Sequence, residues 1–93
     1  MAAESKLEAY LVKRVKELGG ETRKVKWIGR RGAPDRLAWI PGWLWPKLAE
    51  LKSPGKPLED HQKREHKRLK KMGVKCCKLD SVADVDRFLA SKT

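Results

Sequence analysis

The second half of the chain carries the pattern that most constrains its fold, a helix between two strand-like segments. Residues 44–52 and 74–79 are runs typical of strands, and residues 58–72 have the apolar spacing of a helix. The breakers Ser53–Pro57 and Gly73 separate these segments. A strand–helix–strand crossover is right-handed and makes its two strands parallel. The sequence therefore predicts an α/β fold.

The first half adds a helix and two further strands. Apolar residues at helical spacing predict a helix over residues 5–18, which Gly19–Gly20 ends. Residues 23–28 and 36–40 are predicted strands that form an antiparallel meander with residues 44–52. A last helix follows its expected N-cap at residue 81.

The predicted element order is α-β-β-β-α-β-α, which gives a three-layer α/β sandwich around a four-stranded mixed sheet. The 93 residues are predicted to form a single domain, residues 1–93. A domain of this size has a thin core, so association with a second copy would stabilise it.

The charge balance is strongly basic, with 23 Lys and Arg against 12 Asp and Glu and a net charge of +11. Such a surface favours polyanions, most often nucleic acids, because neutralising phosphates releases counterions. A solvated basic surface without a ligand is the alternative. A membrane surface fits less well, since the cationic stretches lack an opposing apolar face, and no apolar run reaches the ~18 residues of a membrane span.

The two cysteines, Cys76 and Cys77, are adjacent. Neighbours on a strand point to opposite faces, which suits neither a disulfide nor a shared metal ion. We interpret both as reduced thiols with a structural role. The start of the chain lacks the basic and apolar regions of a secretory signal. The sequence thus indicates a cytoplasmic protein.

The hairpin between the second and third strands predicts where the chemistry lies. If Gly42–Trp43 are the two central residues of a type II′ turn, paired residue numbers sum to 85. Arg36 then pairs with Ala49, and Asp35 pairs with Glu50. Directly opposed residues share a face of the sheet, so this register brings two carboxylates side by side. A wider turn or a bulge would shift the pairing.

Lys52 lies two residues beyond Glu50 and therefore on the same face. Two adjacent carboxylates repel each other unless a cation lies between them, and hard oxygen ligands suit Mg²⁺ or Mn²⁺. The alternative is a surface salt-bridge cluster, because Glu-x-Lys occurs three times in this highly charged chain. Of the three, Glu50-Leu51-Lys52 is the one that lies on a predicted strand and follows a Pro-Asp at hairpin distance.

These motifs resemble the PD-(D/E)XK nuclease superfamily and, in finer detail, its virus-type replication-repair nuclease (VRR-Nuc) branch. The resemblance covers nearly the whole chain in order and rests on Glu8, Lys26-Trp27, Gly29 to Gly32, Pro34-Asp35-Arg36, Glu50-Leu51-Lys52, Pro54-Gly55, Gln62 and Gly73. It implies a restriction-endonuclease-like sandwich in which the strands lie in the order 1-2-3-4. It also implies that the protein works in a bacterial cell or a phage-infected host.

The resemblance also implies the parts of an active site. Asp35, Glu50 and the Leu51 carbonyl would hold a divalent metal ion with help from Glu8, and Lys52 would orient or activate the attacking water. Gln62 would lie beside this site. From the residues themselves, Glu8 borders an apolar helix face, where a carboxylate without a partner is unusual.

Some of these assignments have rivals in the sequence. Glu4 competes with Glu8 for the metal site but lies in the first helical turn, where helices fray. Gln62 lies on the apolar stripe of its helix and can equally be a structural amide that binds the backbone. His61 and His66 are spaced poorly for a shared ligand, so we interpret both as surface residues.

Recognition of DNA is expected from cations on loops around the site. Phosphate contacts from such side chains position DNA without reading its sequence. The expected DNA-binding residues are Arg30, Arg31, Arg36 and Lys56.

A homodimer is expected as well. Trp39, Trp43 and Trp45 cluster at the hairpin tip, where they can be core, a DNA-stacking wedge or, as we favour, a subunit interface. The apolar residues of the last helix, Val82, Val85, Phe88 and Leu89, offer further surface for a two-fold dimer.

The sequence thus predicts a metal-dependent, structure-selective DNA endonuclease that resolves four-way (Holliday) junctions. A flap or nicking endonuclease is the alternative within this class. A non-catalytic, basic nucleic-acid-binding module is the alternative from another class, but it would not need paired carboxylates where DNA binds.

Overall fold

The computed structural model describes residues 3–93 and contains the seven expected elements. They are α1 (Ala3–Glu17), β1 (Glu21–Lys24), β2 (Arg36–Trp39), β3 (Lys47–Leu51), α2 (Asp60–Lys71), β4 (Cys76–Leu79) and α3 (Val82–Ala90). Their order, α-β-β-β-α-β-α, is the predicted one. Ser81 caps α3 as expected, because its hydroxyl accepts a hydrogen bond of 3.0 Å from the backbone N–H of Asp84.

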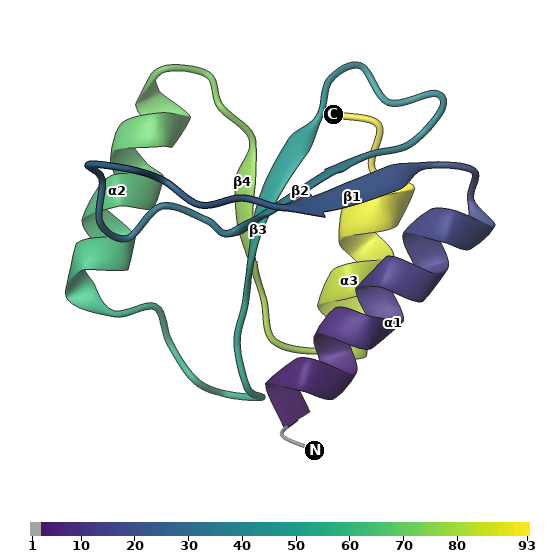
Figure 1. Cartoon of the computed structure of the whole chain (residues 1–93), viewed down its shortest axis with the longest axis horizontal. Helices are drawn as coiled ribbons and strands as arrows, with labels where there is room; N and C mark the ends of the chain where they lie inside the picture. Colours follow the sequence, from purple (N-terminus) through teal and green to yellow (C-terminus); the bar gives the residue numbers. More distant parts are fainter. Residues whose placement is uncertain (1–2) are drawn as a thin grey trace.

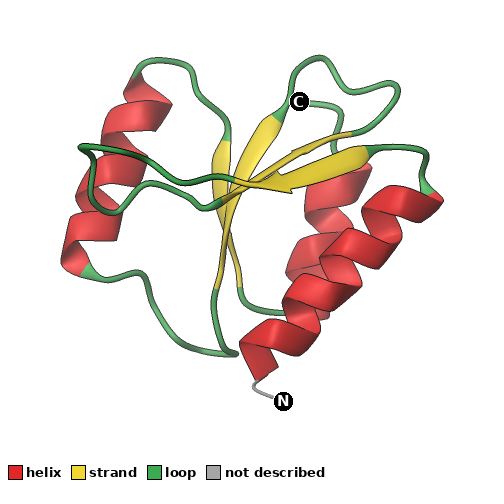
Figure 2. Cartoon of the chain, viewed as in Figure 1, coloured by secondary structure: helices red, strands yellow, loops and turns green. Residues whose placement is uncertain are grey.

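The strands form one mixed sheet in the order β1-β2-β3-β4. Both β1–β2 and β2–β3 are antiparallel, and the crossover through α2 makes β3 and β4 parallel. Helix α2 covers one face, while α1 and α3 lie together on the other (Figures 1 and 2). The predicted three-layer sandwich is confirmed.

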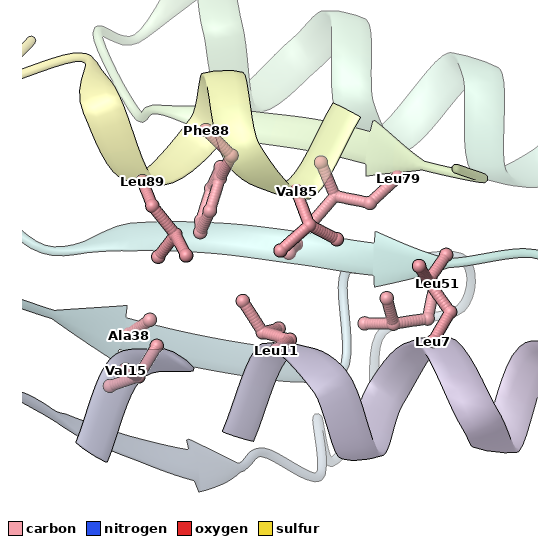
Figure 3. Close-up of a cluster of buried hydrophobic side chains, with 10 residues drawn as sticks. Leu7, Leu11, Val15, Ala38, Leu51, Leu79, Val85, Phe88 and Leu89 are labelled. Carbon is pink, nitrogen blue, oxygen red and sulfur yellow. The ribbon is translucent and has the colours of Figure 1, made fainter. Parts of the chain in front are cut away.

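The larger of two apolar clusters lies between the sheet and the α1/α3 pair (Figure 3). Leu7, Leu11 and Val15 enter it from α1, which shows why this segment is an amphipathic helix. A smaller cluster of Leu48, Leu69 and Cys76 lies under α2. Side chains alternate along β3, so one face of this strand belongs to each cluster.

The first strand lies two residues earlier than expected and ends at Lys24 rather than residue 28. One further ladder-like bond joins the Val25 N–H to the Asp35 carbonyl at 2.7 Å. Trp27 then leaves the strand to pack against the smaller cluster, and its indole N–H donates to the Pro34 carbonyl at 2.6 Å. The predicted strand over residues 23–28 is therefore wrong in its second half, because burial of this indole takes precedence over the ladder.

The predicted hairpin register is confirmed, although the predicted turn is wrong. Arg36 pairs with Ala49, so paired numbers sum to 85. The tight turn, however, spans Ile40 to Trp43, where the Trp43 N–H donates to the Ile40 carbonyl at 3.0 Å. Gly42 has φ +94° and is the second central residue, as in a type II turn. The strands end outside this turn, with a longer connection than a two-residue hairpin has.

The tryptophan nearest the hairpin tip packs against the end of α3. The Trp43 indole packs edge-on against Phe88 with ring centroids 5.5 Å apart, and its N–H donates to the Leu89 carbonyl at 3.2 Å. The Lys47 ammonium lies 4.1 Å from the Trp43 ring centroid and donates to the Phe88 and Ser91 carbonyls at the end of α3. These contacts join the hairpin to α3.

The apolar face of α3 is likewise core, which corrects its expected role in a dimer. Val85, Phe88 and Leu89 are at most 8% exposed, whereas Val82 is 51% exposed. Outside these residues, Leu44 and Trp45 remain exposed at the hairpin. Val85, Phe88 and Leu89 are therefore not available for a dimer interface, whereas Trp45 and Val82 remain exposed.

Both cysteines are free thiols on β4, as predicted. Cys76 is buried and Cys77 half-buried. Among residues 3–93, no helix is long and apolar enough to cross a membrane.

Candidate active site

The candidate site lies where β2 begins and β3 ends. Asp35 directly precedes β2, and hydrogen bonds hold the backbone on both sides of it. The Trp27 indole N–H donates to the Pro34 carbonyl, and the Val25 N–H donates to the Asp35 carbonyl. Pro34 is fully buried and has no N–H to satisfy. The segment before β2 is thus fixed although it is not part of a strand. Trp27 has this supporting role, which composition and spacing did not reveal.

The hairpin register brings Asp35 to Glu50. The last paired residues at this end are Arg36 and Ala49, so the next position outward opposes Asp35 with Glu50. Glu50 is on the face of β3 that carries Leu48 and faces α2. The expected acidic pair therefore has the register from which it was inferred.

Glu50 carries the strongest electrostatic signature of the site. Its side chain is buried, and the residue is 9% exposed. Burial, followed by the negative charges of Asp35 and Glu4, raises the pKa of Glu50 to about 7, and this value includes the opposing effect of Lys52. Among residues 3–93 Glu50 forms no ion pair. A buried carboxylate with a raised pKa beside a second carboxylate marks a candidate functional site.

Lys52 lies just beyond β3, where its backbone N–H donates to the Leu79 carbonyl at 2.9 Å. The residue is 7% exposed, and in the part of the chain described no carboxylate lies within ion-pair distance of its ammonium. A cation that is buried and not neutralised by an ion pair remains available for a ligand's negative charge.

The carboxylate of Glu8 is engaged elsewhere. It accepts a hydrogen bond of 2.7 Å from Arg36 and lies 3.7 Å from the Lys24 ammonium. Although burial acts in the opposite direction, the hydrogen bond and charge of Arg36 hold the pKa of Glu8 below its usual value. Its assignment as a metal ligand stays a prediction that requires this ion pair to open.

Glu4, one turn earlier on α1, acts directly on the site. Its negative charge is among those that raise the pKa of Glu50, and Glu8 is not among them. The first turn of α1 and the connection that leaves β3 approach each other at the same end of the molecule (Figure 1). The rival that sequence reasoning set aside therefore lies on the side of Glu50.

The donors present fit a hard divalent cation. Two carboxylates share one end of the hairpin, and burial together with the negative charge of Asp35 raises the pKa of Glu50 although Lys52 opposes the rise. Within residues 3–93, no three His, Cys, Asp or Glu side chains are gathered closely enough to form a metal site. A complete ligand set would thus need the Leu51 carbonyl, water, or a movement of an α1 carboxylate.

Gln62 is the N3 residue of α2, and its side-chain oxygen accepts a hydrogen bond of 2.9 Å from the Glu59 N–H. This is the backbone-capping amide considered as the alternative to a catalytic role. The amide nitrogen is not used in this bond. The position of Gln62 beside the site stays a prediction.

The basic loop between β1 and β2 is docked on α2 (Figure 1). A Cβ at Gly32, where φ is +84°, would lie 2.5 Å from the His61 carbonyl, so glycine is required there. Arg30 donates to Glu65 at 2.6 Å, and Arg68 binds the same carboxylate. Arg68 and Arg30 hold the pKa of this buried Glu65 at about 2. Sequence reasoning missed Glu65 because an i+3 partner on a charged helix is not distinctive.

The expected DNA-binding cations differ in their availability. Arg31 is exposed and lines a hollow of about 350 Å³ between the loop and α2, together with Arg64. Lys56 is exposed in the turn after β3. Arg36 is different, because its side chain is 13% exposed and ion-paired with Glu8. Its Nε is buried without a partner.

The interpretation of both histidines as surface residues is wrong for His66. This residue is 3% exposed, because it faces the sheet beside Leu69. His61 is half-buried at the start of α2. Burial lowers the pKa of His66, and the charges of Lys70 and Lys52 lower it further.

Comparisons with known proteins identify relatives that align with most of the chain. No family model matches the sequence. The chain is 40% identical over 78 residues to p44 of Acyrthosiphon pisum secondary endosymbiont phage 1, a protein named as a candidate nuclease, and the match covers 84% of this chain and 83% of p44. A solved structure of a VRR_NUC domain superposes with a TM-score of 0.85 at 32% identity, covering 96% of each chain.

The fold is the one that the resemblance to the PD-(D/E)XK nucleases implied. The comparisons identify the branch: the chain belongs to the VRR_NUC nuclease family.

Proposed function

We propose that this protein is a metal-dependent endonuclease that hydrolyses phosphodiester bonds in branched DNA, with four-way junctions as its first candidate substrate. The observation that carries the proposal is Glu50, a buried carboxylate beside Asp35 with a pKa raised to about 7 and an unpaired lysine on the same face. A non-catalytic DNA-binding module has no use for this arrangement, because it repels phosphate and destabilises the fold.

The proposed cofactor is Mg²⁺ or Mn²⁺, held by Asp35, Glu50 and the Leu51 carbonyl. When bound, such an ion polarises a phosphoryl group and lowers the pKa of a water molecule. The chain's own contribution is to hold these ligands in place before the substrate arrives. Both the register of β2 on β3 and the support of Asp35 by Trp27 serve this purpose.

Lys52 is the proposed catalytic cation. Lys52 is 7% exposed and lies on the face of Glu50, where negative charge develops on the phosphoryl oxygens during attack. An interaction that strengthens as this charge develops lowers the barrier, whereas uniform binding does not. The expected products carry a 3′-hydroxyl and a 5′-phosphate, as in the family that the sequence resembles.

An acidic residue of α1 is proposed to complete the site. Glu8 is the residue that the resemblance indicates, and Glu4 is the one whose charge acts on Glu50. Comparing Glu4→Gln with Glu8→Gln separates them. Loss of cleavage with retained stability identifies a ligand, whereas loss of stability is expected if Glu8 serves mainly to neutralise Arg36.

DNA is proposed to lie across the basic loop and the turn after β3. Arg31 and Lys56 are exposed there, and Arg30 becomes available where phosphate competes with Glu65. Arg36 contributes by positioning Glu8 unless their ion pair opens. The net charge of +11 predicts that affinity falls steeply as salt concentration rises.

Junction resolution by a homodimer is the most specific part of the proposal. A two-fold dimer has two active sites and matches the symmetry of a four-way junction. Since Trp43, Val85, Phe88 and Leu89 are part of the fold, a dimer would have to use other residues, such as Leu44 and Trp45. Light scattering at micromolar concentration tests this, and a monomer would remove the dimer.

Cleavage of a DNA panel tests the proposed function. Four-way junction, flap, nicked duplex and linear duplex are each incubated with the protein in Mg²⁺, in Mn²⁺ and in chelator. We expect metal-dependent nicking of branched DNA, with linear duplex cut poorly. Binding without cleavage in either metal would favour the non-catalytic module, and preference for flaps would assign the alternative endonuclease activity.

A further inference from the structure

A second basic hollow lies on α2, separate from the loop that contains Arg30 and Arg31. It has a volume of about 490 Å³ and is lined by Leu58, Lys63, His66, Lys67, Lys70 and Lys71. No acidic residue lines it. In the described residues, none of its four lysines forms an ion pair. Four uncompensated ammonium groups around one hollow favour an anion.

The hollow also contains a polar group that the fold leaves unsatisfied. His66 is 3% exposed, and its Nε2 is buried without a hydrogen-bond partner. A buried polar atom without a partner is costly, and native proteins satisfy nearly all such atoms. An imidazole nitrogen donates a hydrogen bond in one tautomer or when protonated. An anion among the lysines would supply the missing acceptor once their flexible side chains move aside.

The placement of the hollow fits a strand of DNA. Leu58 is six residues beyond Lys52, so one end of the hollow belongs to the connection that leaves the active site. Lys63 and Lys70 are seven residues apart, about 10 Å along the helix axis. That length corresponds to about three nucleotides of one strand.

We propose that this lysine hollow is a second phosphate-binding site, which holds the DNA backbone beyond the cleavage site. The inference rests on the proposed function for the identity of its ligand. It assigns Lys63, Lys67, Lys70, Lys71 and His66 to substrate binding. It also gives a single chain two separate contacts with branched DNA, one at the basic loop and one on α2.

A charge-matched pair of variants tests the proposal. Lys67→Gln/Lys70→Gln removes two charges from the hollow, and Lys13→Gln/Lys16→Gln removes two from exposed positions on α1. The probe is a fluorescein-labelled duplex with splayed arms, and affinity is measured by anisotropy in chelator over a salt series. We expect about tenfold weaker binding and a salt slope smaller by about 1–2 for the hollow variant. The control should bind within about threefold of the parent.

A second readout follows His66 itself by NMR titration of its imidazole. The charged groups around it are Lys70 and Glu65 on α2 and Lys52 after β3, and the thiol of Cys76 lies on β4 beside its backbone. A phosphate nearby favours the protonated imidazole, so the pKa of His66 should rise when the splayed duplex is added. An unchanged pKa would overturn the site.

The outcomes also separate this inference from the proposed function. Equal losses in the two double variants would overturn the hollow, even if the protein cleaves DNA. Selective loss in the hollow variant, in a protein that cuts no substrate in Mg²⁺ or Mn²⁺, would support the hollow and refute the nuclease.

Discussion

Replacing Glu50 with glutamine should stabilise the metal-free protein while it abolishes cleavage. Burial, with the negative charge of Asp35, raises the pKa of Glu50 from 4.5 to about 7. A difference of this size means that the charged carboxylate costs the fold up to about 3 kcal/mol. Glutamine keeps the shape and never ionises, so this cost disappears.

The pH dependence gives the prediction its sign. The folded state holds the Glu50 proton more tightly than the unfolded chain, so this group's contribution to stability falls as pH rises from 4.5 to about 7. The advantage of Glu50→Gln should therefore be near zero at pH 4.5 and reach about 2–3 kcal/mol at pH 8. Denaturant unfolding in chelator at the two pH values measures it.

Added metal supplies the control. An ion that binds the folded state stabilises it by mass action, so Mn²⁺ should raise the Tm of the parent and leave that of Glu50→Gln unchanged. Binding also displaces the Glu50 proton, so metal affinity should increase between pH 6 and pH 8. A glutamine variant that is less stable than the parent at pH 8 without metal would refute the electrostatic description of the site.

Two further predictions concern the basic loop. Gly32→Ala should cost about 2 kcal/mol or more in unfolding free energy because its Cβ would clash with the His61 carbonyl, whereas Gly29→Ala, with the same sign of φ but open space, should cost only about 1; equal losses would contradict the docking of the loop. Glu65→Gln should cost about 2 kcal/mol at pH 7 by leaving two arginines unpaired. The difference should vanish as pH falls from 4.5 through 2, since the lowered pKa of Glu65 means that its contribution is lost on protonation.

The register of the hairpin was predicted from a turn centred on Gly42–Trp43, and it is correct although that turn is not. Gly42 occupies a different turn position from the expected one, yet Arg36 still pairs with Ala49. Alternation along the strands, with a buried face on each side, fixes this pairing. The opposition of Asp35 and Glu50 follows from this register.

The sequence could not show which carboxylates and cations are already paired. Glu8 borders an apolar stripe, as expected, but its charge is taken up by Arg36, a contact between residues 28 apart in the chain. The ion pair of Glu65 with Arg30 likewise joins residues that are far apart in the chain. Such partners depend on how the layers meet, which local spacing does not encode.

The sequence likewise could not show which surface the tryptophans pack against. At the hairpin tip, an aromatic side chain can bind a partner or return to the core, and Trp43 does the latter by packing on Phe88. The helix that contains Phe88 was recognised from the spacing of its apolar residues. This spacing does not show whether the sheet or a second copy of the chain covers the apolar face.

Anomalous diffraction from crystals soaked in Mn²⁺ tests the central claim most directly. The account predicts one strong peak that contacts carboxylate oxygens of both Asp35 and Glu50 at about 2.0–2.3 Å. The peak should be absent from crystals of Glu50→Gln grown in the same form. One such ion cannot contact two carboxylates that lie more than about 8 Å apart. A parent structure with that separation and no peak between the two groups would contradict the proposed metal site.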